Sequence, residues 1–504
     1  MASVSQLPQS GLAQEHVDVL IVGAGLSGIG AAYHLQRDLP GKSYTILGAR
    51  EATGGTWDIF RYPGIRSDSD LHTYGYAFKP WTDEKSIADG PAILRYIRQT
   101  AVENGIDRHI RFGHRVVRSE WSSADARWTV HAERTDTGEQ LRMTCSWLVC
   151  ASGYFRYDHG YEPRFDGAER FRGPIVHPQS WPQDLDYAGK RVVVIGSGAT
   201  AVTLVPAMTD KAAHVTMLQR SPTYVISLPE KDRLANLLKR VLPAERAYAL
   251  TRRKNIWLQR TVYNLSQRRP RLVKRLLRRS LERQLPAGYD IDRHFTPHYN
   301  PWDQRLCAVP DGDLFAAISA GRASVVTDRI AELTERGIRL ASGEELQADV
   351  IVTATGLDLL ALGGIEVLVD GQPVQLPEKL VYKSAMLSDV PNMVFVFGYT
   401  NSSWTLKLDL VCDYVCRLIA YMDRRGYDSC TPVNRSPSMP TRPFLDFGAG
   451  YVRRAVDRFP RQGTEGPWQV KMSYAQDLHV LRDGELDDGV LVFARAAKAL
   501  APAA

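Results

Sequence analysis

Two strand–glycine loop–helix patterns constrain the fold of this 504-residue chain more than any other feature. The first runs from an apolar strand over residues 17–22, through Gly23-Ala-Gly25-Leu-Ser-Gly28, into a helical pattern that ends at Leu35. The second runs from a strand over 191–195, through Gly196-Ser-Gly198-Ala-Thr-Ala201, into a helix over 202–208. A GxGxxG or GxGxxA motif between a strand and a helix is typical of a dinucleotide-binding βαβ unit. The sequence therefore predicts two Rossmann-like units and two nucleotides.

The position that reads the adenosine ribose differs between the two units. A carboxylate is expected about 20 residues after the glycines, but in the first unit this position is Gly48, and Glu51 follows three residues later. The first fingerprint is therefore incomplete, unless Arg50 or the backbone compensates. In the second unit Arg220 and Ser221 follow the strand over 214–219. A cation beside a hydroxyl suits the 2′-phosphate of NADP.

The two units are predicted to interleave. Apolar strands that end in small-residue turns, at residues 148–153 and 350–356, resemble two crossings between a first domain and a second domain inserted into it. Residues 229–290 combine helical periodicity with basic faces and indicate a helical insertion. The predicted fold is α/β with two Rossmann-like domains, divided at 1–155, 156–228, 229–290, 291–348 and 349–504.

Positive charge is concentrated in one segment. Residues 231–283 hold seventeen Lys or Arg and three acids, a net +14, whereas the whole chain carries +7. Basicity confined to one block of an otherwise acidic chain indicates a local surface feature and not a nucleic-acid-binding protein. Helices with apolar and basic faces, together with Trp257 and Tyr263, predict weak, salt-sensitive contact with an anionic membrane surface. The alternative is a solvated basic helix that packs on the second domain.

Other classes of site are not expected. The six cysteines lack the spacing of a metal site and are interpreted as buried reduced thiols, so no metal is predicted. No apolar run reaches the ~18 residues that a membrane-spanning helix needs. A cytoplasmic protein is predicted, and Lys231–Arg283 is a candidate peripheral contact with the inner face of the membrane.

A third pattern lies between the two glycine motifs. Phe171, Gly173, His177, Trp181 and the following proline match F-x-G-x3-H-x3-W-P. With the segments at 54–58, 61–68, 300–305 and 398–404, this pattern resembles the Baeyer–Villiger monooxygenase family of class B flavoproteins. The resemblance covers nearly the whole chain and is strongest to the branch of ethionamide-activating monooxygenases.

The resemblance implies FAD in the first unit and NADPH in the second. The implied cofactor-binding residues of the first unit are Gly23, Gly25, Ser27, Gly28, Gly48, Thr56, Trp57, Asp58, Ile59, Arg66, Ser67, Asp68 and, through its backbone, Val116. Of these, Arg66, Ser67 and Asp68 would lie between the flavin and the nicotinamide. The implied NADPH contacts are Gly196, Ser197, Gly198, Ala199, Thr200, Ala201, Val202, Arg220 and Ser221.

The activity implied by the resemblance is the conversion of ketones to esters or lactones with NADPH and O₂, through a C4a-peroxyflavin, with sulfoxidation as a side activity. Arg305 would stabilise the anions of this reaction, an oxyanion-hole role, and Asp68 would orient Arg305. His177 and Trp181 would couple the nucleotide to domain rotation, although a structural role is equally open for His177. Trp404 and Tyr399 would line the substrate pocket or belong to the core.

Three other functions remain as alternatives. A flavin monooxygenase that oxidises mainly N or S atoms would share both nucleotide units. A disulfide reductase would share them too, but it needs a CxxC motif that the sequence lacks. The third alternative is a protein that binds a membrane surface through residues 231–283. That function would not explain the two nucleotide-binding motifs.

Overall fold

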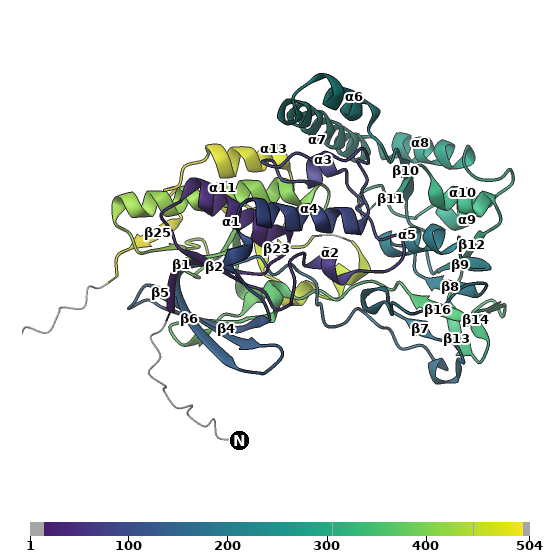
Figure 1. Cartoon of the computed structure of the whole chain (residues 1–504), viewed down its shortest axis with the longest axis horizontal. Helices are drawn as coiled ribbons and strands as arrows, with labels where there is room; N and C mark the ends of the chain where they lie inside the picture. Colours follow the sequence, from purple (N-terminus) through teal and green to yellow (C-terminus); the bar gives the residue numbers. More distant parts are fainter. Residues whose placement is uncertain (1–14, 305, 447, 497–504) are drawn as a thin grey trace, which may run out of the picture.

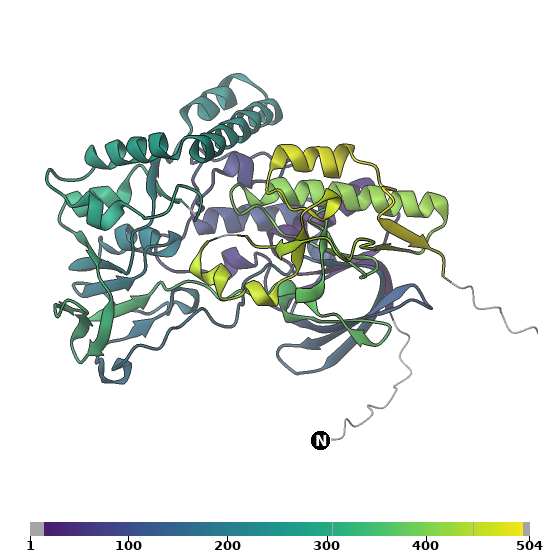
Figure 2. The same cartoon turned by 180° about the vertical axis from the view of Figure 1, so that it is seen from behind.

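The structure is a computed structural model, and it describes residues 15–304, 306–446 and 448–496. Two α/β bodies lie side by side, and a row of helices runs along one edge of the molecule (Figures 1 and 2). The α/β fold predicted from the glycine motifs is confirmed, because each motif connects a sheet strand that has parallel neighbours to the helix that follows it.

The first body contains a nine-stranded sheet in the order β18-β17-β4-β5-β6-β1-β2-β3, with β21 paired to β6. Strand β1 lies between β2 and β6 and is parallel to both. Leu20 and Ile21 of β1 are fully buried, as expected for a parallel strand covered on both faces. The strands are β1 (Glu15–Val22), β2 (Tyr44–Leu47), β3 (Ile110–Arg111), β4 (His114–Ser122), β5 (Arg127–Arg134), β6 (Gln140–Cys150), β17 (Glu366–Val369), β18 (Gln372–Pro373) and β21 (Met393–Phe395).

Helices α1 (Leu26–Asp38) and α11 (Trp404–Arg425) pack closely together in the first body. A Cβ at Gly30 of α1 would lie 2.7 Å from Cδ2 of Leu408, so the missing side chain allows the two helices to approach. Helix α4 (Gly90–Glu103) packs nearby and begins at Asp89, whose carboxylate accepts from the Ala92 N–H at 2.8 Å.

The second body contains a five-stranded parallel sheet in the order β12-β9-β8-β16-β7. Its elements are β7 (Ile175–Val176), β8 (Arg191–Ile195), α5 (Ala199–Met208), β9 (His214–Gln219), α10 (Asp313–Ser319), β12 (Ala323–Thr327) and β16 (Val350–Thr353). The predicted domain boundary at 349 is corrected by this sheet. Strand β16 pairs with β8 and β7, so the chain returns to the first body only after Thr353.

The helices of the edge lie within the predicted insertion. They are α6 (Arg233–Val241), α7 (Ala244–Arg268) and α8 (Pro270–Glu282), followed by α9 (Ile291–Phe295). They connect β10 (Val225–Leu228) to β11 (Cys307–Pro310), which pair in parallel.

The insertion packs on both bodies, and not on the second body alone. Leu281 of α8 belongs to the core of the second body. Arg252 of α7 is 8% exposed and enters the first body, where it donates to the carbonyl of Gly75 at 2.8 Å and to Asp409 at 3.2 Å. The alternative of a solvated basic helix that packs on the second domain therefore does not describe α7, because α7 is fastened to the first body through Arg252.

Smaller elements complete the described chain. They are α2 (Thr56–Ile59), α3 (Leu71–Tyr74), α12 (Gly450–Arg453), α13 (Tyr474–Asp477), β13 (Ile330–Thr334), β14 (Gly337–Leu340), β15 (Glu345–Gln347), β19 (Val381–Tyr382), β20 (Met386–Leu387), β22 (Ser429–Pro432), β23 (Thr441–Pro443), β24 (Arg461–Gly463) and β25 (Leu491–Ala494). All six cysteines are buried. Within the described ranges, no cluster of His, Cys, Asp or Glu is arranged for a metal ion, and no helix combines the length and apolar character needed to span a bilayer.

Burial of His72 predicts a pH dependence of stability. His72 of α3 is fully buried, and burial lowers its pKa from 6.5 to about 4. As pH falls below 6.5 the unfolded chain therefore binds the proton first, and stability is lost progressively until about pH 4. We expect a loss of about 2 kcal/mol between pH 7 and pH 5. Thermal unfolding at pH 7 and pH 5 measures this loss of stability. The loss should be smaller for His72→Gln than for the wild type, whereas the exposed control His159→Gln should lose as much stability as the wild type. Equal losses in all three proteins would contradict the assignment.

Candidate active site

A cavity of about 680 Å³ lies at the carboxyl ends of β1 and β2, beside the first turn of α1. Ten of the thirteen cofactor-binding residues predicted for the first unit line it. They are Gly23, Gly25, Ser27, Gly48, Thr56, Trp57, Ile59, Ser67, Asp68 and Val116. We call this space the dinucleotide cavity.

The glycine loop shapes one wall of this cavity. Gly23 has a φ of +110°, and a Cβ there would lie 2.5 Å from the Ala151 carbonyl oxygen. A Cβ at Gly28 would lie 1.8 Å from the Gly23 carbonyl oxygen, so Gly28 serves packing and does not line the cavity. Helix α1 has no side-chain cap at Gly25. Its first N–H groups suit a pyrophosphate, and the residues present therefore fit a dinucleotide.

Asp58 and Arg66 are not on the cavity wall. Asp58 is 3% exposed, and its carboxylate pairs with Arg50 at 2.8 Å, Arg98 at 2.9 Å and Arg61 at 3.3 Å. Asp58 does not itself line the cavity, whereas its partner Arg50 does. Arg66 instead pairs with Asp313 of α10 at 2.5 Å and joins the two bodies.

Gly48 lies at the end of β2, where a ribose-binding carboxylate was expected. Its N–H donates to the Arg111 carbonyl and its carbonyl accepts from the His114 N–H, both at 2.9 Å. Glu51 is exposed and is not among the residues that line the cavity. Arg50 lines the cavity, but its side chain is already paired with Asp58. Neither Glu51 nor Arg50 therefore replaces the ribose-binding carboxylate that is missing at Gly48.

We expect Gly48→Glu to tighten FAD binding. A Cβ at Gly48 would lie 3.2 Å from Cβ of Ala24, so a side chain fits after a shift of a few tenths of an ångström. A charge-assisted hydrogen bond to the ribose is worth roughly 1.5–3 kcal/mol. Loss of FAD on dilution, followed by flavin fluorescence, measures the effect. The control Gly48→Gln has a side chain of the same size without the charge, and it should tighten FAD binding less. The expectation is contradicted if the wild-type protein retains FAD on dilution as firmly as the Gly48→Glu variant.

The second nucleotide motif lies between β8 and α5. Gly196 has a φ of +141°, and a Cβ there would lie 2.3 Å from the Ala354 carbonyl oxygen. Arg220 and Ser221 are exposed directly after β9. Ala201 and Val202 are fully buried, so their side chains pack in the core and do not form the surface of the site. Gly196, Ser197, Gly198, Ala199 and Thr200 are all at least partly exposed.

The predicted signature segment lies at the connections between the two bodies. Phe171 is buried, and a Cβ at Gly173 would lie 2.2 Å from the Asp349 carbonyl oxygen. His177 Nδ1 accepts from the Gln179 N–H, and Nε2 lies 3.2 Å from the Gly356 carbonyl oxygen. Burial lowers the pKa of His177, which favours a neutral ring that donates from Nε2. Trp181 is half-buried and packs against the hydrophobic core of the second body.

A second, larger cavity of about 1190 Å³ adjoins the first. Its walls come from α6, α7, β10, β11 and the loops at 68–70 and 400–402. Asp68, Ser69 and Ser402 line both cavities, so the two spaces meet at these residues. We call this space the insertion cavity. The sequence did not predict it, because its walls come from segments that are distant along the chain.

Arg305 lies outside the described residues, but its neighbours are placed. Trp302 and Leu306 line the insertion cavity. The chain turns at Asn300, whose carbonyl accepts from the Asp303 N–H at 3.1 Å. In the insertion cavity, Trp302 Nε1 and Asn401 Oδ1 are buried without a hydrogen-bond partner among the described residues. A bound polar molecule would satisfy these atoms.

Helix α11 begins at the dinucleotide cavity. Ser403 is its N-cap residue, but Ser403 Oγ lies 2.7 Å from Thr73 Oγ1 and makes no capping bond. Trp404 donates from Nε1 to Ser27 Oγ at 2.8 Å, and Tyr399 donates to Asp477 at 2.6 Å. Trp404 and Tyr399 line the dinucleotide cavity and not the insertion cavity, and Trp404 also packs against the core of the first body.

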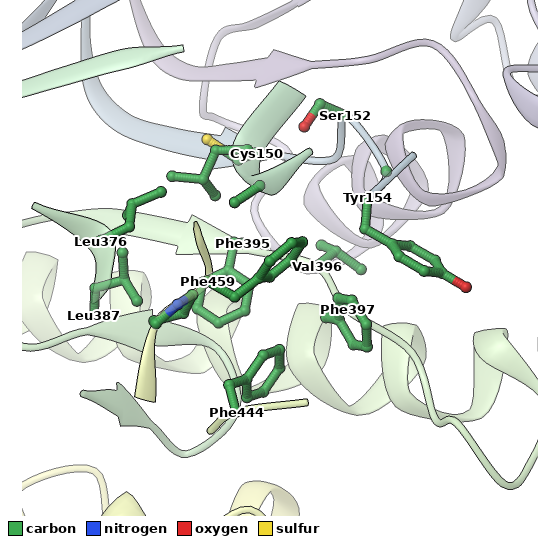
Figure 3. Close-up of a pocket in the computed structure, with 14 residues that line it drawn as sticks. Cys150, Ser152, Tyr154, Leu376, Leu387, Phe395, Val396, Phe397, Phe444 and Phe459 are labelled. Carbon is green, nitrogen blue, oxygen red and sulfur yellow. The ribbon is translucent and has the colours of Figure 1, made fainter. Parts of the chain in front are cut away.

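A small apolar space of about 30 Å³ lies behind the dinucleotide cavity. Figure 3 shows the rings of Phe395, Phe397 and Phe444 gathered around it. The centroids of Phe397 and Phe444 are 5.1 Å apart, and Tyr154 stands 4.8 Å from Phe397. This aromatic cluster holds Tyr154, which lines both spaces, against the body of the domain.

Comparison with known proteins identifies the family. The profile of the flavin-binding monooxygenase-like family matches residues 85–360, and an NAD(P)-binding Rossmann-like domain matches residues 21–83. The FAD-containing monooxygenase EthA of Mycobacterium tuberculosis (strain ATCC 25618 / H37Rv) is 54% identical over 482 residues, which are 95% of this chain and 98% of that protein.

Solved structures agree in fold. An oxidized steroid monooxygenase bound to NADP has a TM-score of 0.74 at 23% identity and covers 95% of this chain and 100% of its own. A complex of OTEMO with FAD and NADP has a TM-score of 0.69 at 22% identity and covers 83% of this chain and 88% of its own. The matches to family and relatives confirm the predicted flavoprotein monooxygenase and its NAD(P)-binding Rossmann-like unit. FAD is named for the relative EthA, and NADP for the two solved structures. The chain belongs to the flavin-binding monooxygenase-like family.

Proposed function

We propose that this protein is an NADPH- and O₂-dependent Baeyer–Villiger monooxygenase that converts aliphatic or aryl-aliphatic ketones to esters or lactones. The observation that carries the proposal is the meeting of two cavities at Asp68, Ser69 and Ser402. One cavity fits a dinucleotide, and the other offers a separate space for a substrate. The segment from Phe171 to Pro182, typical of this family, supports the Baeyer–Villiger reaction.

The residues of the dinucleotide cavity would hold FAD, and the motif at 196–200 with Arg220 and Ser221 would hold NADPH. When bound, the flavin supplies the oxygen-activating chemistry. The chain itself positions and shields the reacting groups. The N–H groups at the start of α1 bind the pyrophosphate, and Trp404 and Tyr399 form part of the wall that limits access of water.

The insertion cavity would hold the ketone next to Asp68. Its Leu, Val and Ile side chains suit the hydrocarbon part of a ketone. The buried Trp302 Nε1 is a donor without a partner among the described residues and suits a carbonyl oxygen. Arg305, three residues later, would stabilise negative charge that develops on that oxygen.

NADPH consumption with a panel of linear, cyclic and aryl ketones, and with sulfides matched in size, tests the proposal. We expect ester or lactone products, identified by mass spectrometry, in amounts that match the NADPH consumed. Sulfoxide formation as a slower side activity is compatible with the proposal. If sulfides or amines are oxidised efficiently and no ketone yields an ester, the protein is an N- or S-oxygenating flavin monooxygenase instead.

A further inference from the structure

Large apolar side chains on the surface are concentrated on the helical insertion. Of fourteen that are strongly exposed among the described residues, ten lie on α6, α7 and α8. Val241 is 66% exposed and Trp257 is 65% exposed. These helices form one edge of the molecule in both views (Figures 1 and 2). So many exposed apolar side chains along a single edge indicate an interaction surface.

The same helices carry cations that the protein itself does not neutralise. Arg246, Arg253 and Arg260 recur every seven residues, so they share one flank of α7, and all three are exposed. The ion pairs recorded within the described chain engage only four of the seventeen cations of residues 231–283. The unpaired positive charge is complementary to an anionic partner.

We infer that the exposed faces of α6, α7 and α8 bind an anionic lipid surface, and that the insertion cavity opens onto this surface. Arginines that flank leucines and a tryptophan match the pattern of helices that lie in a membrane interface. Attraction to anionic headgroups and burial of the apolar side chains act together there. A nucleic acid would use the cations but would leave the leucines and Trp257 exposed.

The insertion cavity is walled by the same helices. Leu234, Leu237, Leu258 and Val262 line this cavity, and all four are 42–54% exposed. A membrane docked on these helices would therefore lie next to the cavity. This part of the inference rests on the proposed function: an apolar ketone dissolved in the bilayer would enter without crossing water.

The surface is held rigidly relative to the site. Asn255 and Gln259 of α7 both donate to the carboxylate of Asp70 at 2.8 Å. Asp70 lies two residues after Asp68, where the two cavities meet, and it also caps α3. With the buried Arg252, these bonds fix α7 against the first body, so a lipid surface bound by the insertion keeps a constant position relative to the opening.

Flotation with vesicles tests the inference on the full-length protein with FAD bound. We expect the protein to float with phosphatidylcholine vesicles that contain 30% phosphatidylglycerol at low salt, and to remain at the bottom with pure phosphatidylcholine. The triple variant Arg246→Gln, Arg253→Gln, Arg260→Gln should bind on the order of a hundredfold more weakly. The matched triple variant Arg127→Gln, Arg336→Gln, Arg424→Gln removes equal charge elsewhere and should bind as wild type.

The apolar contribution is tested with Leu250→Ser combined with Trp257→Ser, since neither residue lines a cavity. This variant should bind vesicles at least tenfold more weakly while it oxidises a water-soluble ketone at the wild-type rate. Its turnover of a long-chain ketone embedded in vesicles should fall. Vesicle binding without oxidation of any ketone would overturn the proposed function but not the lipid surface.

Three results would overturn the lipid surface. In the first, the protein does not float with anionic vesicles. In the second, the wild type and both insertion variants bind the vesicles equally. In the third, equimolar duplex DNA displaces the protein from the vesicles. A concentration-dependent dimer that is abolished by Leu250→Ser with Trp257→Ser would assign the face to a second copy of the chain and would also contradict the inference.

Discussion

Arg305→Ala should lower ester formation by ~10²–10³, whereas reduction of the flavin by NADPH should persist. The guanidinium remains charged at any working pH and offers several donors, so it can stabilise an oxyanion through the reaction. Its neighbours Trp302 and Leu306 line the cavity that meets the dinucleotide cavity at Asp68. NADPH that is consumed without ester should then appear as hydrogen peroxide.

Rapid-mixing spectroscopy separates the two half-reactions of the Arg305 variants. Arg305→Lys is the matched control, because it keeps the charge and loses the planar fork of donors. It should recover part of the ester formation, and both variants should retain FAD. Ester formation by Arg305→Ala at nearly the wild-type rate would remove the main mechanistic support for the Baeyer–Villiger proposal.

Arg220→Ala should weaken the use of NADPH roughly ten- to a hundredfold and leave the slow reaction with NADH nearly unchanged. Arg220 is exposed directly after β9, beside the glycine motif of the second body, and no ion pair is recorded for it within the described chain. Its guanidinium is therefore available to the 2′-phosphate that distinguishes the two nucleotides. One charged hydrogen bond is worth roughly 1.5–3 kcal/mol, which corresponds to the expected factor.

Steady-state kinetics with both nucleotides measure the effect of Arg220→Ala. Arg336→Ala removes another exposed arginine, in the β13–β14 turn of the second body, and should change neither rate. If Arg220→Ala slows NADH and NADPH equally, Arg220 supports the fold and does not read the phosphate.

Local patterns predicted the two nucleotide-binding units well. The strands predicted at 191–195 and 214–219 are β8 and β9, with the same bounds. A buried parallel strand, a glycine turn and a helix each leave a signal within about ten neighbouring residues. Local patterns do not show contacts that form over longer distances along the chain. The carboxylate of Asp58 pairs with Arg98, forty residues later, and Asp58 does not line the dinucleotide cavity.

The sequence by itself determined the fold class, the two nucleotide motifs, the signature segment and the basic insertion, because each depends on residue type at short, regular spacing. The tertiary structure alone decided where the chain returns to the first body, how α7 is fastened and where the two cavities meet. Arg252 binds Asp409, 157 residues away, and the insertion cavity joins loops at 68–70 and 400–402. Such contacts depend on the packing of segments that are far apart along the chain, and no local pattern of residues encodes them.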